Sequence, residues 1–179
     1  MDIATPFLER SRHYLAVEYP TKIRRCLDVL PVEAVWRRTG EHSNCVGNLL
    51  LHLDGNVRQW IVSSVGGAPD HRYRSGEFEA REGVDAMTLF AALRATIVQA
   101  DAVIASLTPS RLLERRTIQG RDVTVLDAVY HVVEHFALHT GQIILLTKQH
   151  APGRIRFYED AGGLAIPRWR DAAGPTDHA

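Results

Sequence analysis

Two long stretches of the chain repeat apolar residues at intervals of three and four, the spacing of one face of an α-helix. Pro109 closes the first of them, because proline cannot continue a helical hydrogen-bond ladder. In the second, Thr124 and Asp127 resemble a capping box, so we expect a helix over residues 125–149. The first stretch, residues 85–107, carries its apolar stripe at Met87, Phe90, Leu93, Ile97, Val98, Ala102, Ile104 and Leu107.

The N-terminal part of the chain predicts another helix, over residues 4–30. Thr5 followed by Pro6 is a typical start, with a capping residue before a proline at the first helical position. Pro20 lies inside this segment and is expected to kink the helix or divide it.

A further helix is expected to begin near Ser43 or Asn44 and to end at Gly66. Gly47 and Gly55 lie in its interior, where glycine destabilises a helix by roughly 1 kcal/mol relative to alanine. Their presence predicts close packing of this helix against a neighbour.

The remaining segments are predicted to be links. Residues 66–83 are polar and are expected to form a long crossover loop with Phe78 as its apolar anchor, and residues 114–122 a short extended or turn segment. With no convincing set of strands, the sequence predicts an all-α four-helix bundle. We expect a single domain over residues 1–179, with the tail 151–179 packed on it or extending from it.

The charge balance and termini limit the classes of function. Lys+Arg and Asp+Glu each number 21, so no basic surplus favours nucleic-acid binding. The N-terminus lacks a basic segment followed by an apolar region, and no stretch approaches the ~20 apolar residues of a membrane span, so we expect a cytoplasmic protein. Cys26 and Cys45 are too far apart for a cysteine metal site and are expected to be reduced and half-buried, with a packing role favoured for Cys45 over a reactive one.

Histidine placement is the most informative feature for function. His131, His135 and His139 follow one another at intervals of four in the last helix, with Gln142 three residues further on. Each step of four advances about 40° around the helix, so neighbouring members of the row can reach one point, but only two of the three easily share a metal ion. The alternative for each is a histidine hydrogen-bonded in the core. Neutral imidazoles suit Zn²⁺, Ni²⁺ or Fe²⁺.

The second helix adds His52, flanked at intervals of four by Asn48 and Asn56 among leucines. This polar row lies where packing alone would favour apolar residues. One histidine from this helix and two from the last would form a three-ligand set with an open fourth position, as in catalytic zinc sites. The other histidines are interpreted as solvated side chains: His13, His42, His71, His150 and His178.

These histidine segments resemble the DinB/YfiT-like superfamily of metal-dependent four-helix-bundle proteins. The similarity lies in NLLLHLDGN around His52 and in HFALHTGQI, and it extends to the loop between Trp36 and Asn44, to GAPDHRYRSGEFEAR and to RFYEDAGG. The resemblance implies one divalent metal ion held by His52, His135 and His139, commonly in a dimer. His131 is a departure that either replaces a ligand or lies behind one. Gln142 is interpreted as a hydrogen-bonding residue and Glu134 as solvated or paired with an arginine.

Relatives in that superfamily include transferases that use bacillithiol or mycothiol, and thiol-dependent maleylpyruvate isomerases. A metal with an open position can lower the pKa of a bound thiol or activate water, so the resemblance implies a thiol transferase or a hydrolase. The alternative is a non-catalytic, stress-related protein that binds a metal or small ligand. No Ser-His-Asp or Cys-His constellation is evident, so the catalytic residues stay undefined. A homodimer is also expected, from the resemblance and from four aromatic residues interpreted as surface: Trp60, Phe157, Tyr158 and Trp169.

Overall fold

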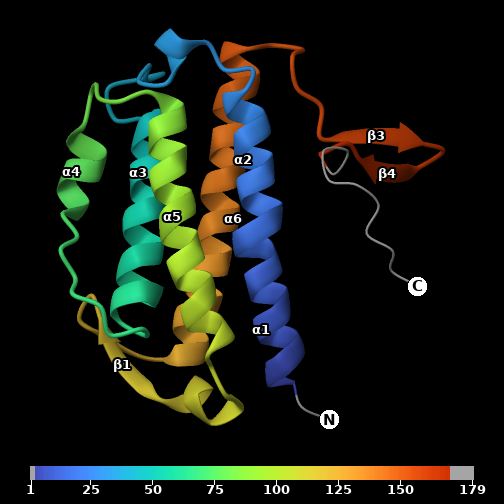
Figure 1. Cartoon of the computed structure of the whole chain (residues 1–179). Coiled ribbons are helices and arrows are strands. Elements are labelled where there is room, and N and C mark those ends of the chain that lie inside the picture. The colour runs from blue at the N-terminus through green and yellow to red at the C-terminus, as the bar shows by residue number, and fades with distance from the viewer. Residues whose placement is uncertain (1–2, 170–179) are drawn as a thin grey trace.

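The computed structural model describes residues 3–169, and this part of the chain is mostly helical (Figure 1). Its α-helices are α1 (Ala4–His13), α2 (Tyr19–Leu27), α3 (Val46–Val57), α4 (Arg74–Glu79), α5 (Ala86–Ala105) and α6 (Val125–His150). Two π-helical turns, η1 (Tyr14–Glu18) and η3 (Arg58–Ser63), extend α1 and α3, and two short 3₁₀ turns are η2 (Val32–Ala34) and η4 (Pro109–Leu113).

The N-terminal helix is continued through a π turn at the position where the sequence predicted a kink or division. The backbone N–H of Tyr19 reaches the carbonyl of Tyr14, the wider spacing of a π-helix. Pro20 follows immediately, at the first turn of α2, where a missing N–H is tolerated. The helix ends at Leu27, before the expected residue 30.

Helix α3 begins later than predicted, because its N-cap is Cys45 and neither Ser43 nor Asn44. The Cys45 Sγ accepts from the backbone N–H of Asn48, and the Asn48 side chain accepts in return from the N–H of Cys45. The close packing predicted from Gly47 is confirmed, since a Cβ there would lie 2.7 Å from the Trp36 ring.

The link between η3 and α5 is not the structureless loop that the sequence predicted, because it contains α4. Figure 1 shows this link running back along the outside of the helices, so that α3 and α5 point the same way. Phe78, the expected anchor, is half-buried, whereas Glu77 beside it is buried.

Helix α5 is, within residues 3–169, the one helix with the length and hydropathy of a membrane span, contrary to the expectation that no such stretch exists. Its mean hydropathy reaches 1.4, and 39% of that window is buried inside the protein. The helix packs against α3, η3 and α1, and its N-cap Asp85 accepts from the N–H groups of Met87 and Thr88. These contacts are those of a core helix.

Two small antiparallel hairpins correct the expectation of no strands. Strands β1 (Arg115–Ile118) and β2 (Arg121–Thr124) join η4 to α6, with Gln119 and Gly120 at positive φ in the turn. Strands β3 (Tyr158–Ala161) and β4 (Leu164–Pro167) form the second hairpin. The capping box predicted at Thr124 and Asp127 is confirmed at the start of α6.

The described part of the tail, residues 151–169, packs on the helices through aromatic side chains. Phe157 and Trp169 are buried, and Lys22 of α2 lies 4.5 Å from the centre of the Trp169 ring. Trp60 is buried as well, so of the four aromatics expected on the surface only Tyr158 is exposed. Residues 170–179, and with them His178, lie outside the described residues.

Helix α3 packs against both α5 and α6, and α2 packs against α6 on the other side. The side chains between them are apolar and fully buried, as at Leu53, Leu93, Val129 and Phe136. Each such side chain contributes roughly 1.5–3 kcal/mol by its removal from water. This packing fixes the α3 face that carries His52 opposite the α6 face that carries the histidine row.

Candidate metal centre

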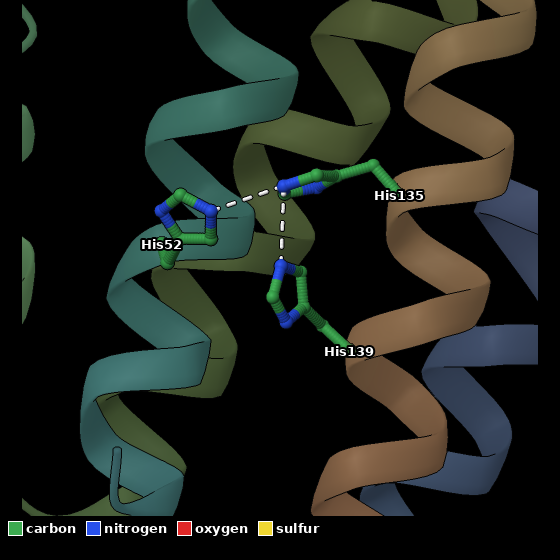
Figure 2. Close-up of side chains that lie close together, drawn as sticks. All are labelled: His52, His135 and His139. Atoms are coloured by element: carbon green, nitrogen blue, oxygen red, sulfur yellow. Dashed lines mark hydrogen bonds between the residues drawn. The ribbon is translucent and has the colours of Figure 1, made fainter. Parts of the chain in front are cut away.

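Three histidines from two helices meet between α3 and α6 (Figure 2). His135 Nε2 lies 3.0 Å from His52 Nε2 and 3.1 Å from His139 Nε2. The ligand nitrogens of all three lie within 4.8 Å of one another. The structure thus brings together the three residues that the resemblance singled out.

The other ring nitrogen of two of these histidines has an oxygen partner. His52 Nδ1 lies 2.7 Å from Glu77 Oε2, and His139 Nδ1 lies 2.7 Å from Gln142 Oε1. These oxygens accept hydrogen bonds, so both Nδ1 atoms carry the proton and both Nε2 atoms present a lone pair to the centre. The hydrogen-bonding role predicted for Gln142 is the one observed. Such outer partners orient the histidine ligands of metal sites.

Burial keeps the imidazoles of His135 and His139 neutral. It lowers the pKa of His135 to about 3, with smaller contributions from the neighbouring His139 and His52. Burial also lowers the pKa of His139, although its hydrogen bond to Gln142 opposes that shift. Neutral imidazoles are the form that binds metal.

This donor set fits a divalent cation. The Nε2 lone pairs of His52 and His139 both face the Nε2 of His135 at hydrogen-bonding distance. His135 Nε2 can carry at most one proton, so it cannot donate a full hydrogen bond to both. The buried Nδ1 of His135 has no partner among the described residues, so that ring lacks an outer hydrogen bond. Three imidazole nitrogens within 4.8 Å of one another could hold a metal ion.

Comparison with known families decides where the chain belongs. Residues 2–159 match the family described as "Protein of unknown function (DUF1572)". The chain belongs to this family. None of the curated proteins compared with this DUF1572 protein matches it.

Among solved structures, the fold is similar to the crystal structure of a DinB-like protein from Bacillus cereus ATCC 10987. The TM-score is 0.59 at 19% sequence identity, over 76% of this chain and 91% of the other. The DUF1572 protein therefore has a DinB-like fold, in agreement with the resemblance found in its sequence.

His131, the fourth histidine considered, lies beside the group and not within it. Its Nε2 is 3.4 Å from Asn56 Nδ2, and its ring centre is 4.0 Å from that of Trp60. Its ring centre lies 5.3 Å from that of His135. The turn of the helix carries it away from the point where the other three meet.

The polar row on α3 has separate structural roles. Asn48 Nδ2 donates to the carbonyl oxygens of Glu77 and Ala80, which ties α4 to the start of α3. Asn56 contacts His131 instead. Of the row, only His52 reaches the centre.

Glu77 and Arg72 were missed as site residues by sequence reasoning. Both lie in a link whose many charged residues predict solvent-exposed side chains. The side chain of Glu77 is nevertheless only 9% exposed and that of Arg72 only 3%. Gly55 was the one sequence signal for these residues. A glycine inside a helix predicts a closely packed neighbour, and the neighbours of Gly55 are the side chains of Glu77 and Arg72. Glu134, by contrast, is exposed as expected.

The cysteines and the remaining histidines lie away from the centre. Cys26 and Cys45 are unbridged and fully buried, more so than the half-burial expected. His42 and His71 are exposed, as predicted. The solvated interpretation is wrong in part for His13, which is half-buried 3.9 Å from Glu18, and for His150, whose Nε2 is buried.

Proposed function

We propose that this protein binds one divalent metal ion through the Nε2 atoms of His52, His135 and His139 within a DinB-like four-helix bundle joined by a crossover link. The observation that carries the proposal is the meeting of these three nitrogens within 4.8 Å. The acceptors behind His52 and His139 support it, because they leave the Nε2 lone pairs free. The metal is Zn²⁺, Ni²⁺ or Fe²⁺ by the chemistry of the ligands.

We further propose that the centre is enzymatic, of the thiol-dependent S-transferase or hydrolase type. A divalent ion with an open position lowers the pKa of a bound thiol or water and so supplies a nucleophile at neutral pH. Glu77 and Gln142 orient the imidazoles of His52 and His139, and burial keeps those of His135 and His139 neutral. His135 and His131 are half-buried while His52 and His139 are buried, which favours approach of a small molecule from the His135 side.

Metal analysis followed by turnover assays tests this proposal. The purified protein is expected to contain about one divalent ion per chain. The loaded protein is then incubated with a model electrophile, chlorodinitrobenzene, with and without a low-molecular-weight thiol, and separately with an activated ester. Thiol-dependent conjugation above the rate of a His135→Ala variant supports a transferase, and thiol-independent ester cleavage supports a hydrolase.

A non-catalytic metal- or ligand-binding protein is the alternative function. It predicts stoichiometric metal with no turnover above the His135→Ala variant in any of these assays. Its open position would then be filled by a small ligand or a side chain.

A homodimer in the cytoplasm completes the proposal. The buried Trp60, Phe157 and Trp169 no longer support a dimer, whereas the exposed Tyr158, Leu164 and Ile166 of the β3–β4 hairpin do. Light scattering at micromolar concentration tests it, and a monomer would count against a dimer.

A further inference from the structure

We propose that Glu77, which lies in the link between η3 and α5, is a positioning residue. It holds His52 in the Nδ1–H tautomer and in the orientation of a metal ligand. This inference rests on the proposed metal centre for its consequence, and on the Glu77–His52 contact for its geometry. The contact joins residues 25 positions apart, and both side chains are less than a tenth exposed.

The proton of the contact lies on His52 Nδ1. Glu77 Oε2 lies 2.7 Å and Arg72 Nη2 lies 3.2 Å from that nitrogen. The shorter contact is to an ionised carboxylate, which only accepts hydrogen bonds, and Arg72 Nη2 has Glu77 Oε2 as a closer acceptor at 2.9 Å. The Arg72 guanidinium contacts both oxygens of this carboxylate, at 2.7 and 2.9 Å, and an adjacent cation favours the ionised form. Nδ1–H therefore points to Glu77, and Nε2 is left as a lone pair 3.0 Å from His135 Nε2.

Arg72 keeps the carboxylate in place. Its Nε lies 2.7 Å from Glu77 Oε1 and its Nη2 lies 2.9 Å from Oε2, a two-point contact that fixes the carboxylate plane. Arg72 Nη1 also donates to Gln59 Oε1 at 3.0 Å. Gln59 in turn accepts from Gln119 in the β1–β2 turn, so the arginine is itself anchored.

The C-terminal end of α4 is hydrogen-bonded to α3 and to the segment that precedes α3. Asn48 donates to the carbonyl oxygen of Glu77, and Arg38 Nη2 donates to that of Phe78 at 2.6 Å. The backbone of Glu77 is thus fixed by one set of bonds and its carboxylate by another. A side chain held at both ends can orient the imidazole that it contacts.

Metal binding and the order of the link are consequently coupled. If the link holds His52 ready for metal, metal on His52 must stabilise the link by the same free energy, because linkage is reciprocal. Amide hydrogen exchange in residues 77–80 should slow when metal is added. Loss of the carboxylate should remove that protection.

The test compares three variants in chelator competition. Arg72→Met with Glu77→Leu removes the acceptor and leaves no unpaired buried charge, and it is expected to bind metal about 10–100-fold more weakly than the parent. Glu77→Gln keeps an acceptor oxygen and should lose less. Glu79→Gln, an exposed residue of the same helix, is the matched control and should bind as the parent does.

Two readouts separate this inference from the proposed function. In metal-free protein, long-range ¹H–¹⁵N spectra should show His52 protonated at Nδ1 in the parent and shifted toward Nε2 in the double variant. If the parent binds no metal, the proposed function fails, and this spectrum still decides the Glu77 role. Unchanged metal affinity in both Glu77 variants, an equal loss in Glu79→Gln, or an unchanged His52 tautomer in the double variant would overturn the inference. Should the double variant not fold, Glu77→Gln decides by its affinity.

Discussion

Gly55 of α3 provides the space that the Glu77 carboxylate occupies. A Cβ at this position would overlap Glu77 Oε1 and would lie 2.9 Å from Arg72 Nε. The glycine weakens the helix locally, but it allows a buried ion pair to approach the helix axis beside His52. A cost in helix propensity is therefore linked to the geometry of the candidate metal centre.

Changing Gly55 to Ala should destabilise the protein in spite of alanine's higher helix propensity. The propensity gain is about 1 kcal/mol, whereas forcing a methyl group into a filled space costs typically ~1–3 kcal/mol and displaces the Glu77–Arg72 pair. We expect a lower melting temperature together with weaker metal binding. Thermal melts and chelator competition measure the two effects.

Gly141→Ala is the matched control on α6. A Cβ there meets no atom within 4 Å, so this variant should be stabilised by roughly 0.5–1 kcal/mol. If both variants were stabilised alike, the close packing described around Gly55 would be wrong.

Alanine substitutions should separate the three central histidines from their neighbour. His52→Ala, His135→Ala and His139→Ala each remove one of the converging nitrogens and should reduce bound metal to background. His131→Ala should retain about one ion per chain, because its ring lies beside Trp60 and Asn56. Elemental analysis after dialysis measures this. Metal loss in His131→Ala alone would mean that the ligand set was misassigned.

The stability of chelated protein should fall with acid between pH 6.5 and about 3. The folded state lowers the pKa of His135 from 6.5 to about 3 and lowers that of His139, so below pH 6.5 the unfolded chain binds more protons. Stability is then fully present above pH 6.5 and declines by about 1.4 kcal/mol per pH unit for each suppressed protonation.

Urea titrations of the metal-free protein at pH 7.5, 6 and 5 measure this slope. His135→Gln, which cannot be protonated, should show a shallower one. Equal stabilities of the parent protein at the three pH values would contradict a neutral, buried histidine cluster.

Both cysteines should resist thiol reagents in the folded protein. Cys26 is fully buried, and burial raises the pKa of its thiol to about 11, so little thiolate forms at neutral pH. The Cys45 Sγ lies 2.9 Å from Asn48 Oδ1 and is equally buried. Ellman titration should detect two thiols in denaturant and react at least about 100-fold more slowly without it. Fast labelling of Cys45 would mean that the cap at the start of α3 opens readily.

Helix positions were accessible from the sequence because they depend on local spacing, whereas the choice of His135 and His139 over His131 came from the family resemblance. Apolar periodicity marked α5, and Thr124 with Asp127 marked the start of α6 to the residue. The start of α3 was misplaced because a buried cysteine serves as its cap, which is a rare choice. The hairpin β1–β2 and helix α4 are too short for a periodic signal, and the sequence left them as links.

The sequence by itself determined that α3 and α6 would carry His52, His135 and His139 on apolar faces, because residues four apart on a helix share a face whatever surrounds them. Only the tertiary structure decided that these faces meet and that His131 lies next to Trp60, outside the group. It also decided that the side chains of Glu77 and Arg72 are buried beside His52. A charged residue in a polar link has no local signal for burial. Its place depends on a partner 25 residues away and on the space left by one glycine, and those relationships exist only after the helices have packed.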